Sequence, residues 1–204
     1  MTQPNDMLQP TTGRLDLHAA AGDALVVFFA RGWVLWAASL IVVLLGVPSM
    51  GILFGPLFGG LFLMAAAALD GKRPRVRDVF GGFRHFVRFF AVAAIWSIAL
   101  ILGTMAYEIG AVLSNALTLL LFPAIVDECG PALAWKRNWR AFVAHPVVFL
   151  FVWLLECGLI VLINLTARST WIFPVLLFAI VLPPLALFKI GLYRLLYPSN
   201  GAPA

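Results

Sequence analysis

The sequence predicts an all-α integral membrane protein, a six-transmembrane-helix bundle with amphipathic interfacial helices on the cytoplasmic side. The first observation is composition: 63% of the 204 residues are hydrophobic and 11% are charged. The mean hydropathy is +1.00, whereas a soluble domain is about half apolar. The second is that the apolar residues form runs that approach the ~20 residues needed to cross a hydrocarbon core. The third is that lysines and arginines gather on one side of these runs.

Six apolar runs can be placed in order along a single transmembrane domain at 15–197. A disordered cytoplasmic tail at 1–14 precedes it, because this segment is polar and contains proline, and a short cytoplasmic tail at 198–204 follows it. The boundary between the third and fourth runs stays open because no proline marks it. The predicted spans are 32–45, 50–69, 89–106, 110–126, 146–165 and 171–187.

Two of these spans carry small residues spaced four apart, which places each set on one face of a helix. Small residues let helix backbones approach closely, and such packing is what holds helices together in lipid. The stripes therefore predict packing within the bundle or, alternatively, a dimerisation face or a helix that moves. The residues are Gly51, Gly55 and Gly59 in the second span and Gly110, Ser114 and Thr118 in the fourth.

Two amphipathic stretches, 79–90 and 132–143, separate basic residues from aromatic ones. In the first, Val79, Phe80 and Phe83 are expected on the face opposite the arginines, a pattern typical of a helix lying in the headgroup plane. Because the positive charge sits at helix ends, the expected partners are anionic lipids of the inner leaflet and not nucleic acid. The residues expected at lipid headgroups are Lys72, Arg73, Arg75, Arg77, Arg84, Arg88, Lys136, Arg137 and Arg140.

The distribution of charge also predicts an orientation. With both termini in the cytoplasm, all of the 14 lysines and arginines except Arg168 fall on the inner side, as the positive-inside rule requires. We therefore expect a multipass protein of the bacterial inner membrane with both ends cytoplasmic.

Glu156 is the candidate site residue inside the membrane. It lies near the middle of the fifth span, where a carboxylate is costly and is expected to face the bundle. One interpretation is a proton or cation site on a transport pathway. The other is a neutral carboxylic acid that hydrogen-bonds to a neighbouring helix, which the sequence favours because it shows no basic partner within the membrane. Pro183 and Pro184 interrupt the last span, as in the broken helices of some transporters, or as a tolerated kink.

No pattern indicates a metal site, a cofactor or a catalytic motif. His18, His85 and His145 lie apart, and Cys129 and Cys157 lack the spacing of metal ligands. An enzyme acting on lipids would rest on Asp127 and Glu128 alone. The simpler interpretation of these two acids is a solvated helix end facing Lys136 and Arg137.

The run GPLFGGLFLMAAAALDGKRPRVRDVFGGFRHF, followed by FPAIVDECGPALAWKRNWRAFVAHP, resembles a family of bacterial multipass membrane proteins of unknown function. That family is similar to the membrane domain that precedes some glycerophosphodiester phosphodiesterases. The resemblance covers about 51–146 and implies a fold; the phosphodiesterase domain is missing, so no catalytic residue is implied. The function favoured by the sequence is a non-enzymatic accessory or scaffold subunit that interacts with other membrane proteins and anionic lipids. The alternative is a small transporter or lipid-translocating protein that uses Glu156.

Overall fold

Helices and the short turns between them make up the described part of the chain. A computed structural model describes residues 10, 16–46, 49, 52–105, 118–127, 129–167 and 172–198. Within these ranges there are seven α-helices, one 3-10 helix and no strand, so the all-helical fold class is confirmed. The elements are α1 (Leu17–Gly46), α2 (Phe54–Leu69), η2 (Val76–His85), α3 (Phe86–Met105), α5 (Leu121–Val126), α6 (Pro131–Ala144), α7 (Pro146–Ala167) and α8 (Ile172–Leu196).

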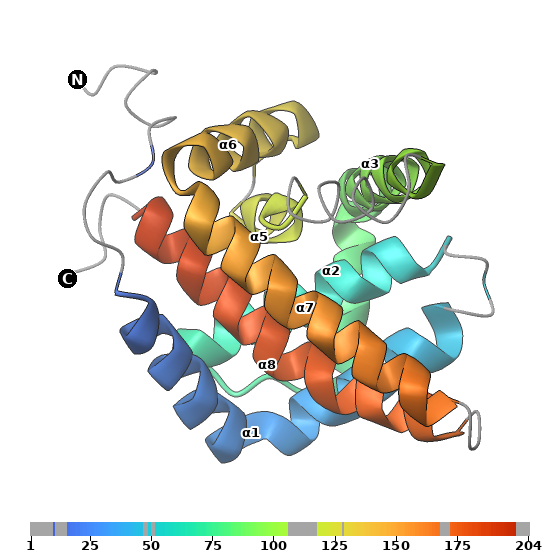
Figure 1. Cartoon of the computed structure of the whole chain (residues 1–204). Coiled ribbons are helices and arrows are strands. Elements are labelled where there is room, and N and C mark those ends of the chain that lie inside the picture. Colours follow the sequence, from blue (N-terminus) through green and yellow to red (C-terminus); the bar gives the residue numbers. More distant parts are fainter. Residues whose placement is uncertain are drawn as a thin grey trace.

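Helices pack against α8 on both of its sides. In Figure 1, α8 (red) lies between α1 (blue) and α7 (orange), and it also contacts α2 and α5. Its buried side chains include Leu182, Leu187 and Ile190. On the far side of α2, η2 and α3 continue the packing. α8 therefore joins α1 to α7, while α2 contacts α1, η2, α3, α5 and α8.

Three of the described helical segments are long and apolar enough to cross a membrane: Leu17–Gly46, Val76–Ala99 and Val175–Leu196. A fourth candidate span would combine α6 with the first half of α7. These two helices are bent by 104° relative to one another, so they form at most a broken span. A multipass membrane protein is therefore supported, whereas six spans are not shown.

The predicted spans and the observed helices differ in where they begin and in their length. The first prediction, 32–45, covers only the second half of α1, which begins at Leu17. The second, 50–69, corresponds to α2, which begins at Phe54 and has 16 residues, about 24 Å against a hydrocarbon core of about 30 Å. Within the fourth predicted span, 110–126, the described residues form a turn and the six-residue α5. These described segments are too short to cross a membrane.

Glycines set the spacing between α2 and its neighbours. A β-carbon added at Gly55 would lie 2.8 Å from the Cβ of Ala93, and one added at Gly59 would overlap the ring of Phe89. Added β-carbons at Gly60 and Gly82 would overlap backbone atoms of η2 and α2, respectively. The described part of the first small-residue stripe therefore packs against α3 of the same chain. Gly51, Gly110 and Ser114 lie outside the described residues, and Thr118 is 4% exposed.

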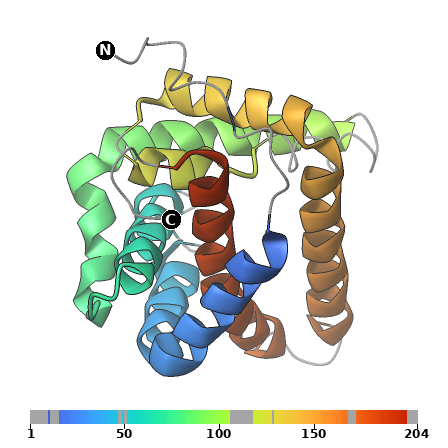
Figure 2. The same ribbon diagram turned by 90° about the vertical axis from the view of Figure 1, so that its left-hand side faces the viewer.

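The two amphipathic stretches form helices, but neither keeps all of the predicted faces. In η2, Val79 is fully buried while Phe80 and Phe83 are exposed, so these three residues do not share a face as expected. The reason is that η2 lies close to α2. This approach places Val79 and Gly82 on the side of η2 that faces α2. In α6, Trp135 and Trp139 are exposed, but Arg137 of the predicted basic face is only 12% exposed. Figure 2 shows α6 (yellow) lying across the end of the bundle.

Candidate functional site

A buried ion pair joins α7 to α8. The Nζ of Lys189 lies 2.6 Å from the Oε1 of Glu156, and the two side chains are 12% and 6% exposed. Burying a charge costs several kcal/mol per ion, and the attraction between paired charges offsets this cost. The pair therefore explains how both residues are accommodated within the bundle.

This pair corrects the sequence interpretation of Glu156 as a carboxylic acid without a basic partner. The predicted sixth span ended at 187, so Lys189 was assigned to its cytoplasmic end. In the structure α8 continues to Leu196, which places Lys189 inside the helix. The signal was present in the sequence, because the apolar pattern resumes after Lys189 with Ile190 and Leu192.

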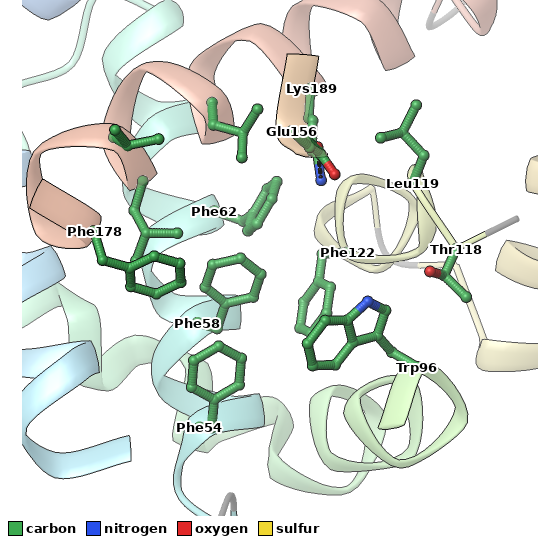
Figure 3. A pocket seen from close by; sticks show the side chains of 13 residues that line it. Phe54, Phe58, Phe62, Trp96, Thr118, Leu119, Phe122, Glu156, Phe178 and Lys189 are labelled. Atoms are coloured by element: carbon green, nitrogen blue, oxygen red, sulfur yellow. Dashed lines mark ion pairs between the residues drawn. The ribbon is translucent and has the colours of Figure 1, made fainter. Parts of the chain in front are cut away.

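Glu156 and Lys189 line one end of a cavity of about 120 Å³ that lies between α2, α3, α5, α7 and α8. They are the charged side chains among the described residues that line it. Figure 3 shows the pair at the top and a set of aromatic rings below it. These rings belong to Phe54, Phe58, Phe62, Trp96, Phe122 and Phe178.

The aromatic rings are fixed by their own contacts. Phe58 meets Phe62 and Phe122 edge to face, with ring centroids 5.0 and 4.8 Å apart. Phe54 stacks on Phe58 at 5.1 Å and on Trp96 at 6.3 Å. Both arrangements are the favourable geometries of aromatic pairs. Three of the rings follow from the sequence directly, because Phe54, Phe58 and Phe62 recur every four residues along α2.

A second polar cluster ties α6 to α8 near the end of the bundle. Arg137 donates hydrogen bonds to Asp127 Oδ2 at 3.2 Å, to Cys129 Sγ at 3.0 Å and to the hydroxyl of Tyr193. The hydroxyl of Tyr197 donates to the carbonyl oxygen of Arg137 at 2.7 Å. The Arg137 side chain is 12% exposed, so it faces this cluster and not a lipid headgroup.

Burial of this cluster changes the chemistry of its acidic groups. Burial raises the pKa of the Cys129 thiol, and the nearby Arg137 guanidinium opposes that shift only in part. Burial also raises the pKa of the Tyr197 hydroxyl to about 12. Thiolates and not thiols are reactive. The cluster is therefore suited to holding two helices together and poorly suited to nucleophilic catalysis.

A third cluster surrounds the carboxyl end of α2. Arg31 of α1 donates to the carbonyl oxygens of Ala68 at 3.0 Å, Gly71 at 2.8 Å and Lys72. Arg194 of α8 forms an ion pair with Asp70 at 2.9 Å. Carbonyl groups at a helix end lack partners within the helix and attract cations. Arg31 thus has a structural role that the sequence analysis did not foresee.

The other predicted site residues are distributed over the surface. The basic residues expected at lipid headgroups, apart from Arg137, are exposed: Lys72, Arg73, Arg75, Arg77, Arg84, Arg88, Lys136 and Arg140. Their contact with lipid stays a prediction. Of the two acids proposed for an enzyme, Asp127 is paired with Arg137, and Glu128 lies outside the described residues.

Comparison with known proteins gives no independent guide to function. No protein-family model matches the chain, and no curated protein or solved structure gives a significant match. The resemblance to the membrane domain of some phosphodiesterases therefore stays a prediction. The functional conclusion must rest on the geometry of the ion pair and its cavity.

Proposed function

We propose that this chain is a small membrane transport protein that binds its substrate in the cavity beside Glu156 and Lys189. The observation that carries the proposal is the placement of a buried ion pair at one end of an aromatic-lined cavity. Ionisable groups inside a membrane bundle commonly mark the path of a substrate or ion. An ion pair with a purely structural role would be expected to be packed tightly by protein on all sides, whereas this one borders a cavity of about 120 Å³.

The position of α7 supports this proposal. Among the described residues, α7 packs mainly against α8 and α6, and its outer side chains Val147, Phe151 and Leu154 are exposed. A helix with few neighbours can move with little loss of packing. Among the α7 side chains that the structure describes, Glu156 lines the cavity, so a movement of α7 would also move one partner of the ion pair.

The accessory-subunit function receives less support from the same geometry. That hypothesis drew on the small-residue stripes, and Gly55 and Gly59 pack against α3 within the chain. In the proposed arrangement the protein lies in a bacterial inner membrane with six spans and both termini in the cytoplasm, and its surface arginines contact anionic lipid. The experiment below also tests for a partner protein.

The first test is extraction of the full chain in native lipid discs, followed by mass spectrometry of the bound small molecules. We compare the wild type with Leu185→Trp, which fills the cavity because Leu185 lines it. The matched control is Leu176→Trp, the same change on the same helix at an exposed position. A small molecule should be retained by the wild type and by the control and lost from Leu185→Trp.

The second step separates binding from transport. Proteoliposomes containing each variant are supplied with the molecule identified in the discs, and its uptake is measured. Uptake by the wild type and the control, but not by Leu185→Trp, is expected. Equal small-molecule content in all three variants, or a protein partner present in equimolar amount, would argue against the transport function, and the second result would favour the accessory subunit.

A further inference from the structure

We propose that an anionic phospholipid binds in a second, larger cavity, with its phosphate group held by Lys72 and Arg194 and the start of its chains against an apolar wall. This cavity shares no lining residue with the one beside Glu156, so the inference is independent of the proposed transport function. Three features carry it: the size of the cavity, the change of its lining from apolar to charged, and the charge that its ion pairs leave over.

The second cavity measures about 720 Å³ and lies between α2, α5 and α8. It separates two of the polar clusters described above. Asp127 and Tyr193 of one cluster line it, and so do Asp70 and Arg194 of the other. Sites for small organic ligands commonly measure about 300–1,000 Å³. The cavity is therefore large enough for an organic ligand and not only for a single ion or a few water molecules.

The lining of this cavity changes from apolar to charged along α2. Leu63 and Ala67 line it within the helix, and Asp70 and Lys72 line it just beyond the carboxyl end. Leu63 and Asp70 are seven residues apart, about 10 Å along a helix axis. Arg194 of α8 pairs with Asp70 at 2.9 Å, so it lies at the same charged end.

This division matches a phospholipid, which carries its charge at one end and its chains at the other. The segment Val175–Leu196 is long and apolar enough to cross a membrane, and Arg194 lies in its last turn. The charged end of the cavity is therefore at the depth of lipid headgroups, and the apolar wall, to which Pro123 and Val126 of α5 also contribute, is at the depth of the chains. A soluble phosphate compound would use the charged end alone.

The ion pairs at the charged end leave one positive charge over. Asp70 is paired with Arg194 and Asp127 with Arg137, and among the described residues Lys72 has no ion-pair partner. Lys72 is exposed. Arg194 is 43% exposed, and a guanidinium has five N–H donors, so it can bind a phosphate while it keeps Asp70. An anionic lipid therefore matches the remaining charge, whereas an ethanolamine headgroup adds an ammonium for which both acids are already paired.

The first experiment measures lipid binding to the full chain by native mass spectrometry. The protein is freed of lipid in detergent and titrated with phosphatidylglycerol, phosphatidylethanolamine or glycerol 3-phosphate. Phosphatidylglycerol should occupy a single saturable site. Phosphatidylethanolamine should bind about fivefold more weakly, the effect expected of one charge at a headgroup, and glycerol 3-phosphate, which has no chains, should show no saturable binding.

A variant that fills the apolar end locates the site. Ala67→Trp places a large side chain in the cavity, which Ala67 lines from a partly exposed position. The matched control is Ala30→Trp, the same change at an exposed position of α1 outside this cavity. Binding of phosphatidylglycerol should be lost in Ala67→Trp and unchanged in Ala30→Trp. The elution profiles of both variants in size-exclusion chromatography check that they are folded.

A second pair of variants separates this site from general attraction to a basic surface. Lys72→Gln should weaken the binding of phosphatidylglycerol about fivefold and abolish its preference over phosphatidylethanolamine. Arg73→Gln changes a neighbouring exposed basic residue that does not line the cavity, so it should leave the affinity and the preference as they are. Both positions are exposed, and neither change is expected to impair folding.

Each contrary result has a distinct meaning. If glycerol 3-phosphate binds as tightly as phosphatidylglycerol, the site holds a soluble phosphate compound and the lipid inference is wrong. If Ala67→Trp binds phosphatidylglycerol like the wild type, or if Lys72→Gln and Arg73→Gln weaken binding equally, the lipid is attracted to the surface in general and the inference is overturned. Equal binding of phosphatidylethanolamine would overturn the selection of an anionic lipid. None of these results bears on uptake through the cavity beside Glu156.

Discussion

Two helix contacts in this molecule are built in opposite ways. The contact of α2 with η2 and α3 is made by glycines, which bring backbone against backbone and ring. The contact of α7 with α8 includes a pair of long charged side chains that border a cavity. The first leaves no room for an added atom, and the second borders a cavity.

The contact made by the glycines is therefore expected to be rigid, and the contact that contains the ion pair is expected to be adjustable. Close-packed interiors resist small changes because neighbouring atoms have nowhere to move. An ion pair between a lysine and a glutamate can open and close through rotation of side chains alone. The glycine contacts hold α2 and its three phenylalanine rings in place. The ion pair borders the cavity, where a ligand could bind to either of its partners in place of the other. We expect substitutions at both contacts to lower the stability, at the ion pair through an uncompensated charge and at the glycines through added volume.

The largest effect is expected from breaking the ion pair on one side. Lys189→Met leaves Glu156 buried without its cation, which should lower the free energy of unfolding by about 3 kcal/mol. Thermal unfolding of the purified protein in detergent measures this. The double variant Glu156→Gln and Lys189→Met should recover most of the loss, because no charge is left uncompensated. A double variant as unstable as the single one would show that the pair is not the reason for the effect.

The next effect tests the glycine contact. Gly82→Ala places a β-carbon against the carbonyl oxygen of Pro56, and the forced backbone shift should cost about 1–3 kcal/mol. The neighbouring substitution Gly81→Ala is the control, since an added β-carbon there meets nothing within 4 Å. Unfolding temperatures of the two variants should differ clearly. Equal temperatures would mean that η2 does not approach α2 as closely as described.

A smaller effect is expected at the carboxyl end of α2. Arg31→Met removes the hydrogen bonds to three carbonyl groups, which should cost about 1–2 kcal/mol because the donor is charged. Arg194→Met removes an ion pair whose side chains are 43% and 42% exposed, and exposed pairs contribute about 0–1 kcal/mol. Thermal unfolding of both variants should therefore rank Arg31 above Arg194. The reverse order would argue against the role of Arg31 at this helix end.

The smallest effect concerns reactivity. Because burial raises the pKa of the Cys129 thiol, little thiolate is present in the folded protein near neutral pH. In a Cys157→Ala background, maleimide labelling at pH 7.5 should be slow when the protein is folded and fast after unfolding in sodium dodecyl sulfate. Since the folded state favours the protonated thiol, stability should fall as the pH rises above the ordinary pKa of cysteine. Fast labelling of the folded protein would contradict the buried cluster.

Helix positions followed from the sequence wherever the local signals were strong. The amphipathic stretch predicted at 132–143 is α6, Pro131–Ala144, which begins with proline in the first turn. The span predicted at 146–165 is α7, Pro146–Ala167, which also begins at a proline. The number of spans did not follow, because hydropathy counts apolar residues without showing that α2 is short or that α6 and α7 are sharply bent.

The sequence by itself determined that the chain is helical, strongly apolar and suited to a membrane, because composition and periodicity are local properties. Only the tertiary structure decided which residues meet. Glu156 and Lys189 pair because α7 and α8 pack side by side, and Arg137 turns inward because α8 presents Tyr193 to it. Such pairings depend on the rotation and depth of each helix against its neighbours. No single helix encodes these quantities, since they arise from packing the whole bundle.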